Sequence, residues 1–521
     1  MSDDQVRRTL ALLERTPGAK DVDPETAAAI LEAARALADD AFAPYGARAD
    51  REGARMQDGR VRLPPGSREL WRAYAESGWL GLDLPERYGG SELPLVLQAA
   101  MLPLFERHAT AFMMGPGAAR AAAHLLAARA GAALSDEWVP KLVAGEWGAT
   151  ICISEPGAGS DVGRLCTRAQ QQGGTWRITG EKIWISFGDH DAVDRIGHCL
   201  LARTEEVPGT RGLSLFLVPD RIGAARNGVT VTRIEDKLGM HASPTCAMSF
   251  EGAQGWLIGE RGRGLAQLFH MIELMRLQTG CQGLGLATMA TECAEAYAAE
   301  RLQGGPPDAP PVPISHHAGV AARLARMRAR TEILRAASLE IACAVEAGRG
   351  GGRAAQAFGG WMLPMFKSFG GEAGFEVADA AIQTLGGAGY TRDRPVERAL
   401  RDARVLTIYE GTTDIQALTL LTRMLWADRS GLDAFLARVE TCDGLHADVA
   451  RTAARELADL SHALAERKGD TAALACAEPY MRQAWCAVSA WLADRIDPDE
   501  AAPFLADLPE RMALNRARCM V

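Results

Sequence analysis

The spacing of the apolar residues changes twice along this chain of 521 residues. Up to residue 148 the apolar side chains repeat at helical spacing, and from residue 263 they do so again. Between these stretches lie short β-branched or alternating runs, separated by turn pairs such as Gly173-Gly174 and Asn227-Gly228. This change of period predicts a mainly α protein with a central β-domain.

The pattern divides the chain into four parts, in line with its length of three to four domain-sized units. We expect a helical domain at 1–148, a compact antiparallel sheet or barrel at 149–262, a second helical domain at 263–426 and a helical tail at 427–521. The predicted strands are 175–179, 183–186, 198–202, 213–218, 229–234 and 245–250. The predicted helices of the second helical domain are 265–302, 320–347, 375–385 and 396–426, with a proline-rich loop at 304–313.

Composition narrows the function classes further. The net charge of −9 disfavours a general affinity for phosphate backbones. Eleven cysteines without a CxxC spacing suggest neither a disulfide framework nor a zinc site. A charged N-terminus and the absence of any apolar stretch of 18 residues predict a cytoplasmic protein that does not enter membranes.

A glycine-rich segment at 155–161 follows an apolar, strand-like run at 150–154. Small residues there allow a ligand to approach the backbone, and Ser154 and Ser160 can hydrogen-bond a heterocycle or a phosphate. The segment fails the dinucleotide fingerprint, because Val162 stands where the third glycine is required. An ordinary glycine-rich turn explains these residues equally well.

Trp184 and Ser186 share one face of a predicted strand, since side chains alternate along a strand. An indole beside a hydroxyl is suited to cover and polarise a flavin ring. For a tryptophan considered alone, packing in the core is the more common role.

Glu410 lies between Ile408-Tyr409 and Gly411, at the junction of two predicted helices. Apolar surroundings raise the pKa of a carboxyl group toward the range of a useful general base. The alternative is a glutamate in the first turn of a helix that interacts with the helix dipole, and for an isolated glutamate this is the more common case.

Four blocks in this order resemble the flavin-dependent acyl-CoA dehydrogenase family: ICISEPGAGSD at 151–161, EKIWIS at 181–186, QTLGGAGY at 383–390 and RDARVLTIYEGTTDIQ at 401–416. The resemblance covers about residues 25–426. It implies an N-terminal helical domain, a β-domain and a C-terminal four-helix bundle. The block at 237–246, the loop at 304–313 and the extra helical tail resemble the longer subfamily that includes 3-methylthiopropionyl-CoA dehydrogenases.

The resemblance also implies roles for single residues. Glu410 matches the catalytic base, and no metal ligand is implied. The matched FAD contacts are Cys152, Ser154, Ser160, Trp184, Ser186, Arg301, Gln383, Gly386, Gly387 and Thr412. The matched substrate contacts are Ser160, Arg276 and Gly411.

The implied reaction is α,β-dehydrogenation of an acyl-CoA or carrier-bound acyl thioester, with electrons passed to an electron-transfer flavoprotein. In the family, residues at the positions of Arg301, Gln383, Gly386 and Gly387 reach the adenosine diphosphate half of FAD from a neighbouring subunit. The resemblance therefore implies a homodimer or a homotetramer.

Two other functions remain open at this point. One is a flavin oxidase, monooxygenase or desulfinase on the same fold, because fold does not fix function. The other is a DNA-associated relative, suggested by five arginines within thirteen residues: Arg323, Arg326, Arg328, Arg330 and Arg335. The acidic total instead favours a solvated helix face or a contact with cofactor phosphates or another subunit.

Overall fold

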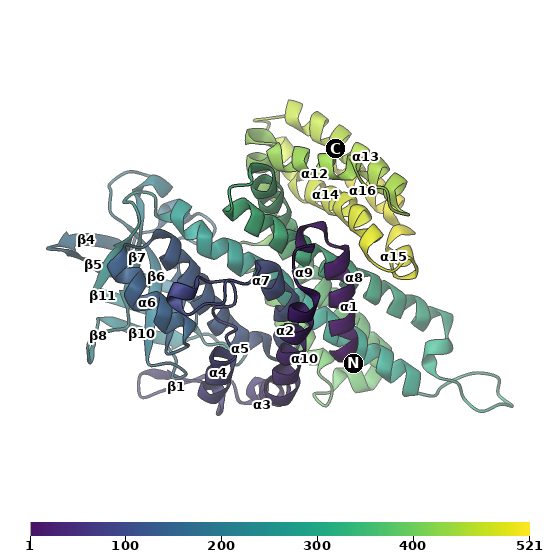
Figure 1. Cartoon of the computed structure of the whole chain (residues 1–521), viewed down its shortest axis with the longest axis horizontal. Coiled ribbons are helices and arrows are strands. Elements are labelled where there is room, and N and C mark those ends of the chain that lie inside the picture. The colour runs from purple at the N-terminus through teal and green to yellow at the C-terminus, as the bar shows by residue number, and fades with distance from the viewer. Residues whose placement is uncertain (1, 521) are drawn as a thin grey trace. The chain divides into compact units, whose positions relative to one another are not determined.

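The computed structural model describes residues 2–520, which group into two units (Figure 1). One unit, here called the helical unit, contains residues up to 36, 94–107 and those from 276 onward. The other, the β unit, contains 37–93 and 108–275. Helices α5 (Leu95–Arg129) and α7 (Gly264–Glu300) contribute turns to both units.

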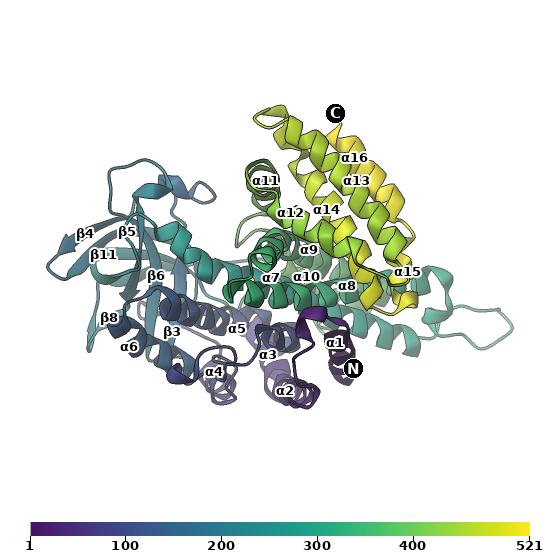
Figure 2. The same ribbon diagram turned by 45° about the horizontal axis from the view of Figure 1, so that its top comes forward.

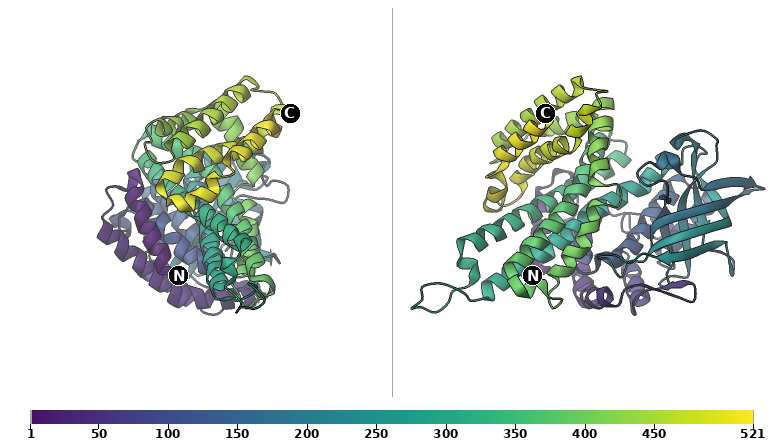
Figure 3. Two further views of the ribbon diagram at one scale, coloured as in Figure 1. Left: turned by 90° about the vertical axis from the view of Figure 1, so that its right-hand side faces the viewer. Right: turned by 180° about the vertical axis from the view of Figure 1, so that it is seen from behind.

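The β unit is built on a seven-stranded sheet. Pairing runs from β11 through β5, β4, β6 and β7 and returns to β11, so the sheet closes on itself. This confirms the expected central β-domain, whose strands are visible from behind in Figure 3. The strands are β3 (Trp147–Cys152), β4 (Arg168–Gln172), β5 (Thr175–Ser186), β6 (Arg195–Arg203), β7 (Leu213–Pro219), β10 (Val229–Ile234) and β11 (Thr245–Ile258).

The prediction that residues up to 148 are helical is wrong in two places. Strands β1 (Arg55–Gln57) and β2 (Arg60–Arg62) form an antiparallel hairpin, and β3 already begins at Trp147. The hairpin turn is Asp58-Gly59, with φ of 51° and 69°. Two successive positive φ values are typical of a type I′ turn, for which Asp-Gly is a strong sequence signal. The remaining helices of this unit are α3 (Ala43–Glu52), α4 (Ser67–Glu76) and α6 (Ala132–Val143).

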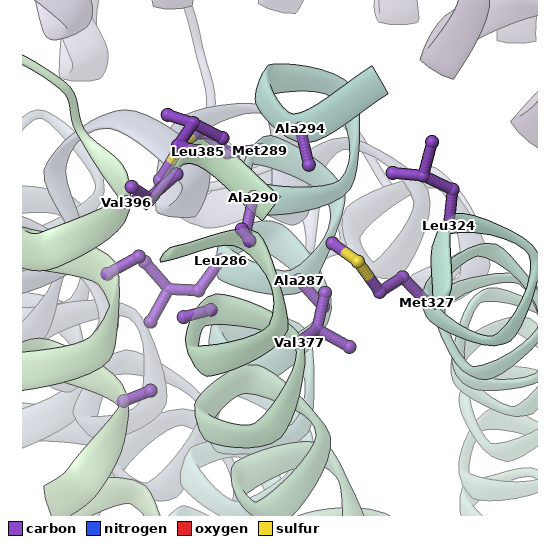
Figure 4. Packing of buried hydrophobic residues seen from close by; sticks show 14 of the residues in the cluster. Leu286, Ala287, Met289, Ala290, Ala294, Leu324, Met327, Val377, Leu385 and Val396 are labelled. Carbon is purple, nitrogen blue, oxygen red and sulfur yellow. The ribbon is translucent and has the colours of Figure 1, made fainter. Parts of the chain in front are cut away.

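The core of the helical unit lies where four helices meet (Figure 4). Leu286 from α7, Leu324 from α8 (Ala318–Arg349), Val377 from α9 (Arg353–Leu385) and Val396 from α10 (Val396–Ala403) pack in one buried cluster. The predicted helix at 375–385 is thus the end of a longer one. The predicted helix at 396–426 is interrupted at 408–412, after which α11 (Thr413–Leu421) begins. The helical unit also contains α1 (Ser2–Arg15) and nearly all of α2 (Pro24–Leu37).

Helices α7 and α9 cross through glycines. Gly280 lies against Gly370, and Gly283 lies against Gly374, so residue numbers rise together and the helices run parallel. Glycine removes the side chains that would otherwise keep two helix backbones apart. The two helices can therefore bring side chains from both of their middle turns to the same segment of chain.

The tail is helical, as predicted, and its helices lie together in Figures 1 and 2. They are α12 (Ser430–Glu440), α13 (Ala447–Glu466), α14 (Ala477–Leu492), α15 (Pro498–Leu505) and α16 (Leu508–Cys519). Trp485 stacks on Phe369 of α9 with ring centroids 5.2 Å apart, and Phe435 stacks on Trp361 at the same separation. Aromatic pairs of this kind bury large apolar areas, so the tail is packed onto α9.

Three further features follow from the described residues, 2–520. None of their helices is long and apolar enough to cross a membrane. They contain no group of three or more His, Cys, Asp or Glu side chains that could hold a metal ion. All eleven cysteines are free thiols.

Candidate active site

The segment that carries Glu410 has an unusual backbone. Glu410 has φ of 56° and Gly411 has φ of 88°, both in the left-handed region. For a residue with a side chain this conformation costs about 1–3 kcal/mol, and it persists where surrounding contacts enforce it. The φ of Gly411 favours glycine, and a Cβ atom there would also lie 2.6 Å from Gln416 Nε2, so a larger residue would displace that side chain.

Three side chains from three helices hold the two carbonyl groups of this segment. Gln416 Nε2, on α11, donates to the Glu410 carbonyl at 2.8 Å, and Arg276 Nε, on α7, donates to it at 3.3 Å. Lys367 Nζ, on α9, donates to the Gly411 carbonyl at 2.6 Å. These hydrogen bonds supply the contacts that the left-handed backbone needs.

Burial raises the pKa of Glu410, and the positive charges of Arg276 and Lys367 partly oppose that rise. Burial lowers the pKa of Lys367 to about 7, an effect that the charge of Glu410 opposes and that of Arg276 reinforces. Burial likewise lowers the pKa of Arg276. The raised pKa makes the Glu410 carboxylate a stronger base than an exposed glutamate, which suits proton transfer.

A buried polar chain anchors the residue before the base. Tyr409 donates from its hydroxyl to Gln282 Oε1 at 2.5 Å, and Gln278 Nε2 donates to Glu106 Oε1 at 2.8 Å. Burial raises the pKa of both Tyr409 and Glu106 well above their usual ranges. Burial therefore favours the neutral forms of both groups, and their hydrogen bonds help to orient the segment.

The β unit holds the second group of predicted residues. Trp184 has φ of 64°, lies at a register shift between β5 and β11, and is 58% exposed. Ser154 and Ser186 are half-buried. An exposed indole beside two hydroxyls fits a planar heterocycle such as the isoalloxazine of FAD. The expectation that Trp184 is more often a core residue does not hold here.

A buried ion pair joins the glycine-rich segment at 155–161 to the strand segment at 181–186, which carries Trp184. Lys182 Nζ donates to Glu155 Oε1 at 2.8 Å and to the Ile153 carbonyl at 2.9 Å. Burial raises the pKa of Glu155, but the Lys182 charge and several hydrogen bonds outweigh this and hold it below its usual range. The Ile183 amide donates to the Ser154 carbonyl at 2.9 Å. The strand that carries Trp184 is thus fixed against the glycine-rich segment.

The side chain of Cys152 lies inside the β core. It is 0% exposed, and its thiol is 3.4 Å from Thr150 Oγ1, which is in turn 2.8 Å from His198 Nδ1. Ile151 and Ile153, on either side, are partly exposed. A cofactor can therefore contact the backbone of Cys152 but not its thiol.

Four predicted cofactor residues lie far along the bundle from Glu410. Because α7 and α9 run parallel, Arg301 and the group Gln383, Gly386 and Gly387 lie at the same end of the bundle, and all four are exposed. From Arg276 to its last residue, α7 rises about 36 Å. Of the other predicted residues, Ser160 is exposed, whereas Thr412 uses its hydroxyl to accept from the Ile415 amide at 3.3 Å.

Sequence reasoning did not identify three of the residues that build the site: Lys182, Lys367 and Gln416. Lys367 and Gln416 are buried residues in helices. The residues next to Lys367 give no sign that it bonds Gly411, more than forty residues away, and those next to Gln416 give no sign that it bonds the Glu410 carbonyl. Lys182, Glu155 and Gln416 lie within the sequence blocks that resemble the family, but the sequence assigns them no role. Within the helical unit, a half-buried carboxylate lies on a left-handed turn. Within the β unit, an exposed indole and two half-buried hydroxyls suit a planar heterocycle, as in a flavoprotein.

Comparison with known proteins gives the family. Three family models match the chain: acyl-CoA dehydrogenase N-terminal domain at 24–146, middle domain at 150–253 and C-terminal domain at 262–425. The chain is 37% identical over 423 residues to 3-methylmercaptopropionyl-CoA dehydrogenase of Ruegeria pomeroyi, covering 78% of this chain and 72% of that protein. It is 35% identical to the broad-specificity linear acyl-CoA dehydrogenase FadE5 of Mycobacterium tuberculosis, covering 78% and 71%.

Solved structures extend the likeness of fold over nearly the whole chain. Caenorhabditis elegans ACDH-11 in complex with C11-CoA matches with a TM-score of 0.82 at 23% identity, covering 98% of this chain and 89% of that one. An acyl-CoA dehydrogenase complexed with FAD from Bacillus anthracis matches with a TM-score of 0.81 at 20% identity, covering 98% and 90%. The tail is therefore part of a shared fold.

This chain belongs to the acyl-CoA dehydrogenase family. It is an FAD-dependent oxidoreductase that dehydrogenates acyl-CoA thioesters. The comparisons thus confirm the family resemblance seen in the sequence, including the resemblance to the longer subfamily. The oxidase-type and DNA-associated alternatives are not favoured. Three of the arginines behind the latter form ion pairs within the chain: Arg328 with Glu295, Arg330 with Glu376 and Arg335 with Glu332.

Proposed function

We propose that Glu410 is the base that removes the α-proton of the acyl-CoA thioester. The observation that carries this proposal is the placement of its half-buried carboxylate near the charges of Arg276 and Lys367, on a backbone held by three side-chain donors. Burial makes the carboxylate a stronger base, while the two cations keep it ionised before reaction.

The backbone of Glu410 has a second role in the proposed reaction. Its carbonyl accepts from Gln416 and Arg276, whereas its N–H group makes no hydrogen bond within residues 2–520. As the α-proton leaves, negative charge develops on the thioester oxygen. The N–H of Glu410 donates to that oxygen and stabilises the charge, as backbone amides do in oxyanion holes.

The remaining cofactor and substrate contacts of this proposal follow the resemblance to the family. Trp184, Ser186 and Ser154 hold the flavin ring, Thr412 and Ser160 contact FAD, and Ser160, Arg276 and Gly411 also contact the substrate. FAD, when bound, supplies the acceptor for the β-hydrogen, which leaves as hydride while the α-carbon electron pair forms the double bond.

We infer that the active site is completed by a second copy of the chain. Arg301, Gln383, Gly386 and Gly387 are exposed about 36 Å along the bundle from Arg276, which supports a contact with the adenosine diphosphate of a neighbouring subunit's FAD. A homodimer or homotetramer follows, with an electron-transfer flavoprotein as the acceptor of electrons. The division into domains at 1–148, 149–262, 263–426 and 427–521 is part of the same proposal.

The test of the reaction is anaerobic bleaching of the bound flavin. The purified holoenzyme is mixed with butyryl-CoA, 3-methylmercaptopropionyl-CoA and 2-methylsuccinyl-CoA, the acyl groups of similar dehydrogenases. We expect rapid loss of visible flavin absorbance with at least one thioester. In Glu410→Gln we expect the rate to fall by about 10²- to 10⁴-fold, with FAD content unchanged. Equal bleaching by both proteins would exclude Glu410 as the base.

Subunit sharing has its own test. Glu410→Gln and Arg301→Ala subunits, each defective alone, are unfolded together, refolded with FAD and assayed. If Arg301 serves the partner's cofactor, each mixed dimer holds one site with neither substitution, so part of the activity returns. No recovery, with mixed dimers demonstrated by differential tags, would show that Arg301 does not act across subunits.

A further inference from the structure

Lys367 is a fully buried lysine in the middle of α9, with 0% of its surface exposed. Its ammonium group donates to the Gly411 carbonyl and has no carboxylate within 4.0 Å among residues 2–520. Burying a charge without an ion-pair partner is expensive, and an apolar side chain of the same length would fill the space without that penalty. The position therefore calls for a reason other than packing.

The charged groups around Lys367 and Glu410 come from three elements. Arg276 faces Glu410 from α7, and the charge of Arg423, in the π-helical segment Thr422–Ala427 after α11, acts on Arg276. Lys367 itself faces Glu410 from α9, and Glu410 is the carboxylate whose charge acts on Lys367. Tyr409, next to the base, is partly buried, and its raised pKa keeps its hydroxyl neutral.

We propose that Lys367 is a positioning residue for the reaction: it fixes the carbonyl of Gly411 and places a positive charge beside the Glu410 carboxylate. The hydrogen bond holds the left-handed turn at 410–411, and with it the direction of the Glu410 N–H group. At pH values where Lys367 is protonated, its charge favours the ionised form of the base. This inference rests on the proposed role of Glu410.

The chain offers a comparison that separates these two effects. Gln416 is equally buried and also holds the segment, through its hydrogen bond to the Glu410 carbonyl at 2.8 Å, but it carries no charge. Gln416→Met therefore loosens the turn alone. Lys367→Met loosens the turn and removes the charge. Methionine fills a comparable volume at both positions with a flexible apolar side chain.

The experiment measures kcat and KM against pH for both variants, using the thioester that bleaches the wild-type flavin best. We expect kcat to fall about tenfold in each variant, with KM changed less than about twofold, because the interaction serves the reaction and not binding. Removing a cation beside a carboxylate raises its pKa. The acid limb of the kcat profile should therefore move to higher pH by about one unit in Lys367→Met, and should not move in Gln416→Met.

Ser368→Ala is the control on the same helix, because Ser368 is 0% exposed and its hydroxyl has no hydrogen-bond partner among the described residues. It should leave kcat, its pH profile and FAD content unchanged. If Lys367→Met fails to retain FAD, Lys367→Gln, which keeps a donor but no charge, should show the same shift of the acid limb.

A folded, FAD-loaded Lys367→Met enzyme with the wild-type acid limb and kcat would overturn the proposal. An equal shift in Gln416→Met would also overturn it, since the charge would then not be its cause. These outcomes differ from failure of the proposed function, in which Glu410→Gln would itself retain turnover.

Discussion

Gly283 of α7 lies against Gly370 of α9 so closely that a Cβ atom on Gly283 would be 1.9 Å from the Gly370 carbonyl oxygen. This contact sets the spacing of the two helices. Arg276 and Lys367 project from those helices to the same two-residue segment, Glu410-Gly411. The geometry around the base thus depends on a crossing that only glycine permits.

Gly283→Ala is expected to reduce both stability and activity. The added methyl group meets backbone and not a movable side chain, so the helices must separate, at a cost of about 1–3 kcal/mol. Separation also draws Arg276 or Lys367 away from residues 410 and 411, and kcat should fall. Thermal melting and steady-state kinetics measure the two effects.

Gly360→Ala, also in α9, is the matched control. A Cβ atom there would meet nothing within 4 Å. Alanine in a helix interior is more stable than glycine by about 0.5–1 kcal/mol, so this variant should melt at or above the wild-type temperature. Identical behaviour of the two variants would contradict the close crossing.

The tail should detach from α9 when the stacking of Trp485 on Phe369 is removed. Trp485 is 9% exposed and stacks on Phe369, with an interplanar angle of 18°. Trp485→Ala should lower the free energy of unfolding by about 3–5 kcal/mol and speed limited proteolysis within residues 427–520. Leu514→Ala is the control in the tail, because Leu514 is 51% exposed and its loss should change stability by less than about 0.5 kcal/mol.

Acid sensitivity of the β unit should depend on Asp83. Burial raises the pKa of Asp83, but the charges of Arg120 and His124 outweigh it and hold that pKa well below its usual range. Because the folded-state pKa lies below the unfolded value of about 3.9, ionised Asp83 stabilises the fold above that pH. The contribution is lost as pH falls toward the folded-state pKa.

Asp83→Asn should therefore cost about 3–5 kcal/mol near neutral pH, since it leaves the buried Arg120 charge uncompensated. The difference in melting temperature between the wild type and Asp83→Asn should become smaller only below about pH 4. Asp161→Asn, which removes an exposed pair with Arg164, should change stability by no more than about 1 kcal/mol at any pH. A gap for Asp83→Asn that does not change down to pH 2 would contradict the linkage.

Trp184 should matter for the cofactor and not for the fold. Since its side chain is 58% exposed, Trp184→Ala should change the melting temperature of the apoprotein very little. Loss of an aromatic stacking partner worth about 0.5–1.5 kcal/mol should weaken FAD binding by about two- to tenfold. Titration of the apoprotein with FAD, followed by flavin fluorescence, measures this. Trp184→Phe, which keeps a ring, should bind FAD more tightly than Trp184→Ala.

The order of the elements could be predicted because helix and strand periods are local properties of sequence. The strand that carries Trp184 and the helix that begins before Arg276 both follow from spacing alone. The hairpin at 55–62 carried a local signal, Asp58-Gly59, yet its strands are only three residues long and show no alternation to detect. Glu410 could be singled out because the sequence block around it is specific.

The sequence by itself therefore determined the kind of protein and the order of its elements, and it singled out Glu410 as the proposed base. Only the tertiary structure decided which buried groups serve that base. Lys367 and Gln416 lie in helices where nearby residues give no sign of a partner, and their role arises because α7, α9 and α11 meet at one turn. Contacts between distant residues depend on how helices cross, and here the crossing is set by glycines whose function is invisible until two backbones are seen to touch.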